Sequence, residues 1–289
     1  MNWITDILEN LFKDSIIDAI MASFEGIFDD VNQQVNDISV QVGQTPEAWN
    51  SGVFTMVRTL SETVVLPIAG IILTFVLCYE LIQLIIEKNN LADFDTFNIF
   101  KWIFKSFIAI FILTNTFTIV LSVFEVVQSV VNESATFITE ETQLGDPDMM
   151  DNIREQLEEQ SIGSLFALFF EVQVIRLALG AMVIVIFVVI WGRMIEIYLT
   201  ISLAPIPLAT MTNREWSSIG NNYLKALFAV AFQGFLIMVC VAIYATLVSS
   251  IGTTDSIRAS IWTVASYTAL LCFILLKSGG VAKSVLNAH

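Results

Sequence analysis

The run from Leu177 to Gly192 contains no charged residue, and it limits the possible folds of this chain more than any other feature. An α-helix rises about 1.5 Å per residue, so the run would be roughly 24 Å long, slightly less than a hydrocarbon core of about 30 Å. Arg176 and Arg193 stand at its two ends, and arginine side chains are long enough to reach the headgroups. The run therefore predicts a membrane-spanning helix.

The composition extends this conclusion to the whole chain. Hydrophobic residues make up 56% of it, charged residues make up 14%, and the mean hydropathy is +0.75. Soluble domains carry about a quarter charged residues. We therefore predict an all-α, polytopic membrane protein with about five transmembrane helices and an amphipathic helix at the N-terminus.

Apolar runs and the polar stretches between them indicate how the chain is divided. The sequence predicts an N-terminal part outside the cytoplasm, residues 1–52, and a membrane domain of about five spans, residues 53–289. An acidic outer loop, residues 132–161, separates the second span, at about 102–131, from the third. The sequence leaves open whether residues 164–192 form one helix or two.

Residues 3–31 have the pattern of an amphipathic helix. Its apolar face includes Ile20, Phe24 and Ile27, and acidic residues take most of the other positions. A helix that rests on anionic lipid is rich in lysine on its polar face, whereas this one has only Lys13. We favour packing of the apolar stripe on protein, with a lipid surface as the alternative. Residues 32–52 are predicted to be a polar linker.

The stretch after Gly192 departs from an ordinary span. Arg193 and Glu196 lie three residues apart, on one face of a helix. Pro205 and Pro207 then remove backbone donors and end the helix. Ionisable groups at membrane depth are costly unless they face protein or water. This stretch therefore indicates a protein interface or a pore lining, and the alternative is a plain anchor that ends at the prolines.

Other charged residues lie in or beside the predicted spans. They are Glu80, Glu125, Glu171 and Arg176. We treat them as candidate channel or interface residues, because intramembrane ionisable residues commonly mark transport pathways. The alternative for each is that its side chain reaches the headgroup layer.

The distribution of basic residues predicts the orientation. With the N-terminus outside, the inner side would hold Lys88, Lys101, Lys105, Arg193, Arg214, Lys225, Lys277 and Lys283. The outer side would hold only Lys13, Arg58, Arg154, Arg176 and Arg258. Basic residues favour the cytoplasmic side. We predict a multi-pass protein of the cell membrane with the N-terminus outside and the C-terminus in the cytoplasm.

The sequence lacks the patterns of common catalytic sites. We find no P-loop, dinucleotide fingerprint, zinc-ligand spacing or nucleophile elbow. The single histidine is His289, and the cysteines Cys78, Cys240 and Cys272 all fall in apolar runs. We therefore predict no enzymatic activity, no metal and no cofactor.

Several features together resemble the TrbL-like family, the polytopic inner-membrane subunits of conjugative type IV secretion systems. They are the outer N-terminal segment, about five spans, the large polar loop before the third span, and the LAPIPLA sequence at 203–209. The resemblance implies a channel-forming or channel-gating subunit that forms a homo-oligomer around a path for single-stranded DNA and its attached relaxase. It also implies partners in the machine: a bitopic scaffold subunit, secretion ATPases and a coupling protein.

Two other functions stay open at this stage. The formal net charge of -15 would repel phosphate, which prevents a channel wall from trapping DNA but could also exclude DNA altogether. A structural scaffold of the same machine is therefore one alternative, and a small-solute transporter or ion channel is the other. Co-purification with secretion ATPases would favour the secretion machine, and stabilisation by a solute would favour the transporter.

Overall fold

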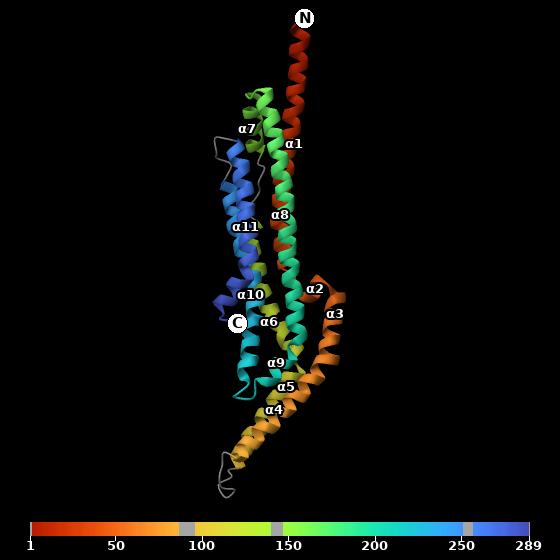
Figure 1. Cartoon of the computed structure of the whole chain (residues 1–289), viewed down its shortest axis with the longest axis vertical. Helices are drawn as coiled ribbons and strands as arrows, with labels where there is room; N and C mark the ends of the chain where they lie inside the picture. The colour runs from red at the N-terminus through yellow and green to blue at the C-terminus, as the bar shows by residue number, and fades with distance from the viewer. Residues whose placement is uncertain (1, 87–95, 140–146, 251–256, 289) are drawn as a thin grey trace. The chain divides into compact units, whose positions relative to one another are not determined.

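A computed structural model describes residues 2–86, 96–139, 147–250 and 257–288, and within these ranges the side chains of 11–86, 97–133, 150–250 and 257–288. The described residues form helices and no strand (Figure 1). The elements are α1 (Asn2–Val42), α2 (Pro46–Trp49), α3 (Ser51–Leu60), the π-helix η1 (Ser61–Val65), α4 (Leu66–Ile86), α5 (Thr96–Thr114), α6 (Thr116–Thr139), α7 (Pro147–Glu158), α8 (Ile162–Leu203), α9 (Pro205–Thr210), α10 (Ser217–Ser249) and α11 (Ile257–Val285). This confirms the all-α class.

Among the residues that the structure describes, six helical segments are long and apolar enough to cross a membrane, judged by length and composition. They are Ser51–Ile86, Phe97–Thr114, Thr116–Glu133, Ile162–Leu203, Ser217–Ser249 and Ile257–Val285. The chain is therefore a polytopic helical membrane protein. The count exceeds the predicted one because the second predicted span, 102–131, is divided between α5 and α6.

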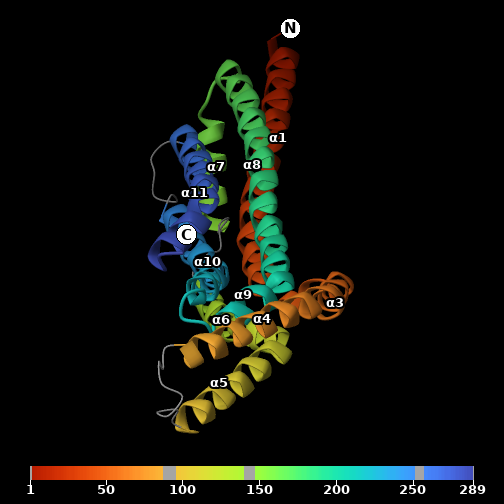
Figure 2. The same ribbon diagram turned by 60° about the horizontal axis from the view of Figure 1, so that its bottom comes forward.

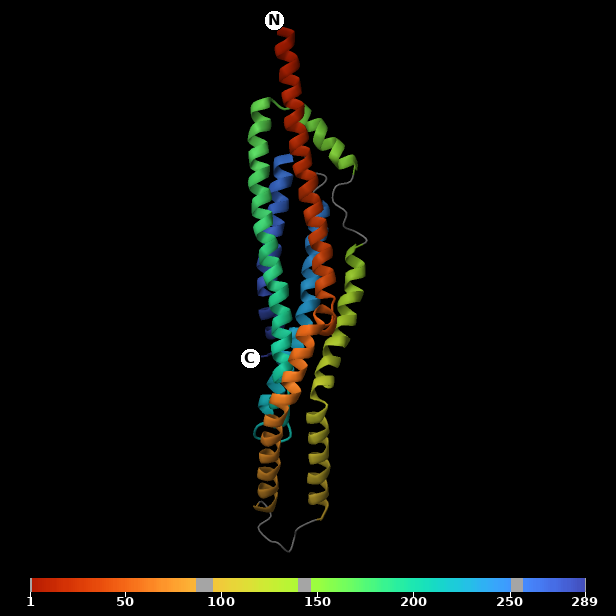
Figure 3. The same ribbon diagram turned by 90° about the vertical axis from the view of Figure 1, so that its right-hand side faces the viewer.

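The division of the second span lies at Asn115. The Asn115 side chain donates to the carbonyl of Phe111 at 2.9 Å, and the neighbouring Thr114 hydroxyl donates to that of Ile110 at 2.9 Å. Such side chains compete with the backbone for hydrogen bonds and bend helices. The backbone bonds from Asn115 to Phe111 and from Ile119 to Asn115 persist, so the chain bends without reversing (Figure 3). The described residues thus provide six candidate spans, one more than the predicted five, because the bend at Asn115 divides the second predicted span.

Helix α8 answers the question left open for residues 164–192, since it is one helix of 42 residues. At about 1.5 Å per residue it is roughly 63 Å long, about twice the hydrocarbon core, so only part of it can lie in the membrane. It ends at Leu203, and Pro205 opens the short helix α9. Proline is tolerated at a first helical position because no backbone donor is needed there. The prolines therefore end the helix as predicted.

Most of the predicted linker at 32–52 is helical instead. Helix α1 runs on to Val42 because Val35, Ile38 and Val42 continue its apolar face, and all three are buried. Two further helices follow, α2 and α3. The side chains of Thr45 and Asn50 cap them by accepting bonds from backbone amides at 3.2 and 2.9 Å.

The chain divides into two compact units. One unit comprises Met1–Val42, Asn132–Ile190 and Ile237–Lys277, and the other comprises Gly43–Val131, Trp191–Leu236 and Ser278–His289. We call them unit 1 and unit 2. Helices α8, α10 and α11 contribute residues to both.

Unit 1 is built around the pair of α1 and α8, which run in the same direction side by side (Figures 1 and 2). Ile20, Phe24 and Ile27 of α1 are 0–2% exposed and belong to one apolar core with Leu168 and Val172 of α8. The predicted apolar stripe therefore packs on protein, and that protein is the chain's own α8. These residues are not free for another subunit.

Unit 2 has two apolar clusters. The larger one includes Phe54 of α3, Phe117 of α6, Met194 and Ile201 of α8, and Leu227 of α10. The smaller one joins α4, α5 and α9 through Ala69, Leu73, Ala109, Leu113 and Ala209. Small residues at these contacts allow helices to approach closely. They bring α4 and α5 next to the proline-containing α9.

Candidate functional site

Arg193 of α8 is buried in unit 2, with 5% of its surface exposed. Its Nη2 atom donates to the carbonyl oxygen of Ala231 on α10 at 3.5 Å, which is a long hydrogen bond. Its Nε atom has no hydrogen-bond partner among the described residues. A buried charge without a close counter-ion is costly, and removing a partner from one typically costs several kcal/mol. Arg193 is therefore an exceptional residue within this unit.

Glu196 does not pair with Arg193, although the two residues lie three positions apart on α8. Its Oε1 atom accepts a hydrogen bond from Nζ of Lys283 at 2.9 Å, and these two side chains are 41% and 47% exposed. The two α8 residues diverge because Arg193 extends towards α10 at Gly234, whereas Glu196 meets Lys283 of α11. Each side chain thus connects α8 to a different helix.

A buried polar contact joins α10 to α11 in the same unit. The amide Nε2 of Gln233 donates to the hydroxyl of Ser278 at 3.0 Å. Gly279 provides the room, since a Cβ at that position would lie 3.2 Å from the Gln233 nitrogen. Sequence reasoning overlooked Gln233, although a single amide within an uncharged run is a signal for a contact between helices. We call this contact, together with Arg193 and the pair of Glu196 and Lys283, the polar cluster of α8, α10 and α11.

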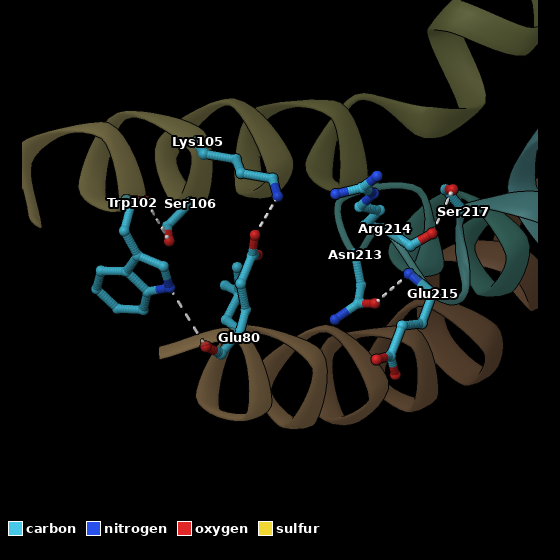
Figure 4. A network of polar contacts seen from close by, with 9 residues as sticks. Glu80, Trp102, Lys105, Ser106, Asn213, Arg214, Glu215 and Ser217 are labelled. Carbon is cyan, nitrogen blue, oxygen red and sulfur yellow. Dashed lines mark hydrogen bonds and ion pairs between the residues drawn. The ribbon is translucent and has the colours of Figure 1, made fainter. Parts of the chain in front are cut away.

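A second polar cluster of unit 2 connects α4 to α5 (Figure 4). Lys105 of α5 forms an ion pair with Oε1 of Glu80, whose side chain is 22% exposed. The indole of Trp102 donates to the carbonyl of Leu77 at 3.3 Å. The other carboxylate oxygen of Glu80 is buried without a partner among the residues described. Glu80 was predicted as a candidate, but its partner Lys105 was not.

The loop after α9 lies against α4 next to that ion pair. Glu215 accepts hydrogen bonds from the hydroxyl of Tyr79 at 3.2 Å and from the amide of Gln83 at 3.1 Å. The rings of Tyr79 and Trp216 are stacked, with centroids 5.9 Å apart. Pro205 is buried and Pro207 half-buried at the start of α9, the short helix that leads into this loop.

The remaining predicted residues lie elsewhere. In unit 1, Glu171 accepts a hydrogen bond from the Trp262 indole at 2.6 Å and pairs with Arg258 at 3.2 Å. The exposed guanidinium of Arg176 lies over Gly26 of α1, where a Cβ would be 3.3 Å away. Glu125 is exposed on α6. The candidates therefore do not converge on one site.

The described side chains offer no group of three or more His, Cys, Asp or Glu residues that could hold a metal ion. The ionisable residues occur instead as separate pairs that join one helix to another. Such an arrangement can hold and release helices, but it shows no nucleophile beside a base.

A comparison with protein families determines the class of protein. Residues 31–205 match the family described as TrbL/VirB6 plasmid conjugal transfer like protein, which is more than half of the chain. The chain belongs to this family. Comparisons with curated proteins and with solved structures give no match. Family membership confirms the resemblance and makes the chain a multi-pass membrane component of a conjugal transfer, or type IV secretion, machine.

The matched range of this TrbL/VirB6 family protein contains most of the candidate residues. It extends from the last third of α1 to Pro205, so it includes both the Glu80 cluster and Arg193 with Glu196. Pro207 and the stripe of Ile20, Phe24 and Ile27 lie outside it. The match therefore ends where α8 meets α9.

Proposed function

We propose that this protein forms or gates the channel through which the conjugation machine passes single-stranded DNA with its attached protein. The observation that carries the proposal is the polar cluster of α8, α10 and α11, three largely apolar helices that contain Arg193, Gln233 and an ion pair at this level. A helix that only anchors a protein has no use for a buried charge, whereas channels and transporters retain such groups along their pathways.

The cluster has the properties that a gate requires. The pair of Glu196 and Lys283 is about half exposed, and such pairs contribute about 0–1 kcal/mol. The end of α11 can therefore leave α8 at a small cost in free energy. Arg193 is buried against α10, so α8 and α10 would stay together during this movement.

The family and the distribution of basic residues lead us to propose an oligomeric state, partners and an orientation for the channel. The helices of one chain enclose too little space for a protein-conducting path, so we propose a homo-oligomer, arranged as a ring. Its other partners would be a bitopic scaffold subunit, secretion ATPases and a coupling protein. The bias of basic residues supports an N-terminus outside and a C-terminus in the cytoplasm.

Crosslinking in mating cells tests the proposal. We expect that transfer is lost when the gene is deleted, and that the transferred strand is crosslinked to this protein in cells that carry it. Lys283→Glu should reduce transfer, and Lys283→Glu with Glu196→Lys should restore it. Loss of transfer on deletion without any crosslinked strand would support a scaffold instead. Unchanged transfer after deletion would contradict both roles.

A further inference from the structure

Helix α1 has an acidic face from Asp14 to Asp37. Its buried face continues past the core of unit 1 through Val31, Val35 and Ile38, which are 2–6% exposed. The opposite face is open to the surroundings. Its exposed acidic residues are Asp14, Asp18, Glu25, Asp29, Asp30 and Asp37. The amides of Gln33 and Asn36 lie on the same open face.

The register of α1 against α8 is fixed by contacts inside unit 1. The amide of Gln173 donates to the hydroxyl of Ser23 at 3.0 Å across 150 positions of sequence. Arg176 lies over Gly26 at the same offset. Beyond Gly26, the two helices run on side by side in each view (Figures 1–3). Asp37 lies about 16 Å further along α1 than Gly26, so it is level with the middle of the uncharged run of α8.

Other helices of unit 1 mark the same level as membrane depth. The uncharged run of α11, residues 259–276, lies beside that of α8, since Arg258 pairs with Glu171 and the Cys272 thiol donates to the Met182 carbonyl at 3.6 Å. The polar helix α7 lies at the other end of α1, where Arg154 pairs with Asp18 at 2.7 Å. Helix α1 thus leads from an aqueous region to the level of the apolar runs.

We infer that the second half of α1, residues 27–42, lies at membrane depth with its acidic face turned to a water-filled path. The inference rests on the proposed channel function, and it replaces the extracytoplasmic placement expected for these residues. Lipid is not a suitable neighbour, because one aspartate at the centre of a bilayer costs about 2.5–3.5 kcal/mol or more. The exposed residues of α8 at this level, such as Ile184 and Val188, are apolar and suit lipid.

The charge of the chain argues for water over a second copy against this face. The sequence holds 28 acidic residues against 13 lysines and arginines. A second α1 would bring the same acidic residues to the contact, and like charges repel. Water keeps the carboxylates solvated, and a wall of this kind would repel a DNA backbone without binding it.

Cysteine accessibility tests the inference. In a chain with Cys78, Cys240 and Cys272 replaced by serine, we would introduce Gln33→Cys, Asn36→Cys or Asp37→Cys. The reagent is a membrane-impermeant, charged thiosulfonate, applied to the assembled machine in intact cells. We expect these sites to react about tenfold or more faster than matched cysteines at Ile184 and Val188, because thiolates form in water and not in lipid. Asp18→Cys, beside α7, is the positive control.

Two results would overturn the inference. One is that the α1 sites react as slowly as those of Ile184 and Val188 while Asp18→Cys reacts fast. The other is that they are protected and form disulfides between copies on oxidation, which would place a second copy on this face. Labelling is scored on the protein itself, whereas loss of transfer on gene deletion is scored separately. A failure of the channel proposal is therefore distinguishable from a failure of the α1 placement.

Discussion

The guanidinium group of Arg193 occupies the space that a side chain at Gly234 would need. A Cβ at Gly234 would lie 2.5 Å from Nη2 of Arg193 and 2.9 Å from its Cζ. The contact joins α8 to α10 inside unit 2, where the guanidinium is buried. Helix α10 can approach this arginine only because residue 234 has no side chain.

Gly234→Ala should therefore destabilise the protein. Alanine normally stabilises a helix relative to glycine by about 0.5–1 kcal/mol, whereas overpacking of a buried contact costs about 1–3 kcal/mol. We expect a lower midpoint of thermal unfolding in mild detergent. Gly192→Ala is the matched control, because a Cβ there meets nothing within 4 Å, and it should leave the midpoint unchanged or raise it. Equal midpoints for the two variants would show that Arg193 moves away freely.

Double-mutant cycles should show that Glu196 is coupled to Lys283 and not to Arg193. The 2.9 Å pair is half exposed, so its coupling free energy should be about 0.2–1 kcal/mol. The effects of Glu196→Ala and Arg193→Ala on stability should add within about 0.5 kcal/mol, because they contact different helices. The unfolding midpoints of the single and double variants provide the measurement. A coupling larger than this between Arg193 and Glu196 would contradict the arrangement.

Arg193 and Glu196 also show how much of the candidate site could be predicted from the sequence. The 3.6-residue period correctly placed Arg193 and Glu196 on adjacent positions of one helix face. It could not show that Gly234 opens a slot for arginine or that Lys283 lies nearer to the glutamate, because both depend on packing between distant segments. Apolar run length predicted the helical class, and the prolines predicted the break at Pro205, because both are local properties. The bend at Asn115 is local too, and its neighbouring threonines were an available signal.

Lys105→Met should destabilise unit 2 through Glu80. The glutamate would lose its ion-pair partner while its other carboxylate oxygen is buried without a partner among the described residues. An unsatisfied buried polar group costs about 1–3 kcal/mol, and more when it is charged. We expect a clear fall in the unfolding midpoint.

The double variant Lys105→Met with Glu80→Gln should recover part of that loss, because no unpaired charge is left. Glu62→Gln serves as the control, since its pair with Arg58 is exposed and such pairs contribute little. If Lys105→Met changes the unfolding midpoint no more than Glu62→Gln does, the ion pair between Lys105 and Glu80 does not hold α4 and α5 together.

Replacement of Pro205 and Pro207 by alanine should impair transfer while membrane insertion stays intact. Ala204 already has helical backbone angles, with φ -50° and ψ -38°, so a donor at residue 205 would let α8 continue into α9. A continued helix would carry Ala209 away from α4 and pull Glu215 from Tyr79 and Gln83.

Two measurements check this expectation at equal membrane levels of the protein. One is transfer frequency, and the other is a crosslink between Gln83→Cys and Glu215→Cys, made with a bifunctional thiol reagent in a chain without other cysteines, since the ends of the native side chains are in contact at 3.1 Å. We expect the double-alanine variant to lose both. Pro67→Ala, an exposed proline in the first turn of α4, is the control and should keep both. Normal transfer with an intact crosslink in the double-alanine variant would show that the prolines only end a helix and have no functional role.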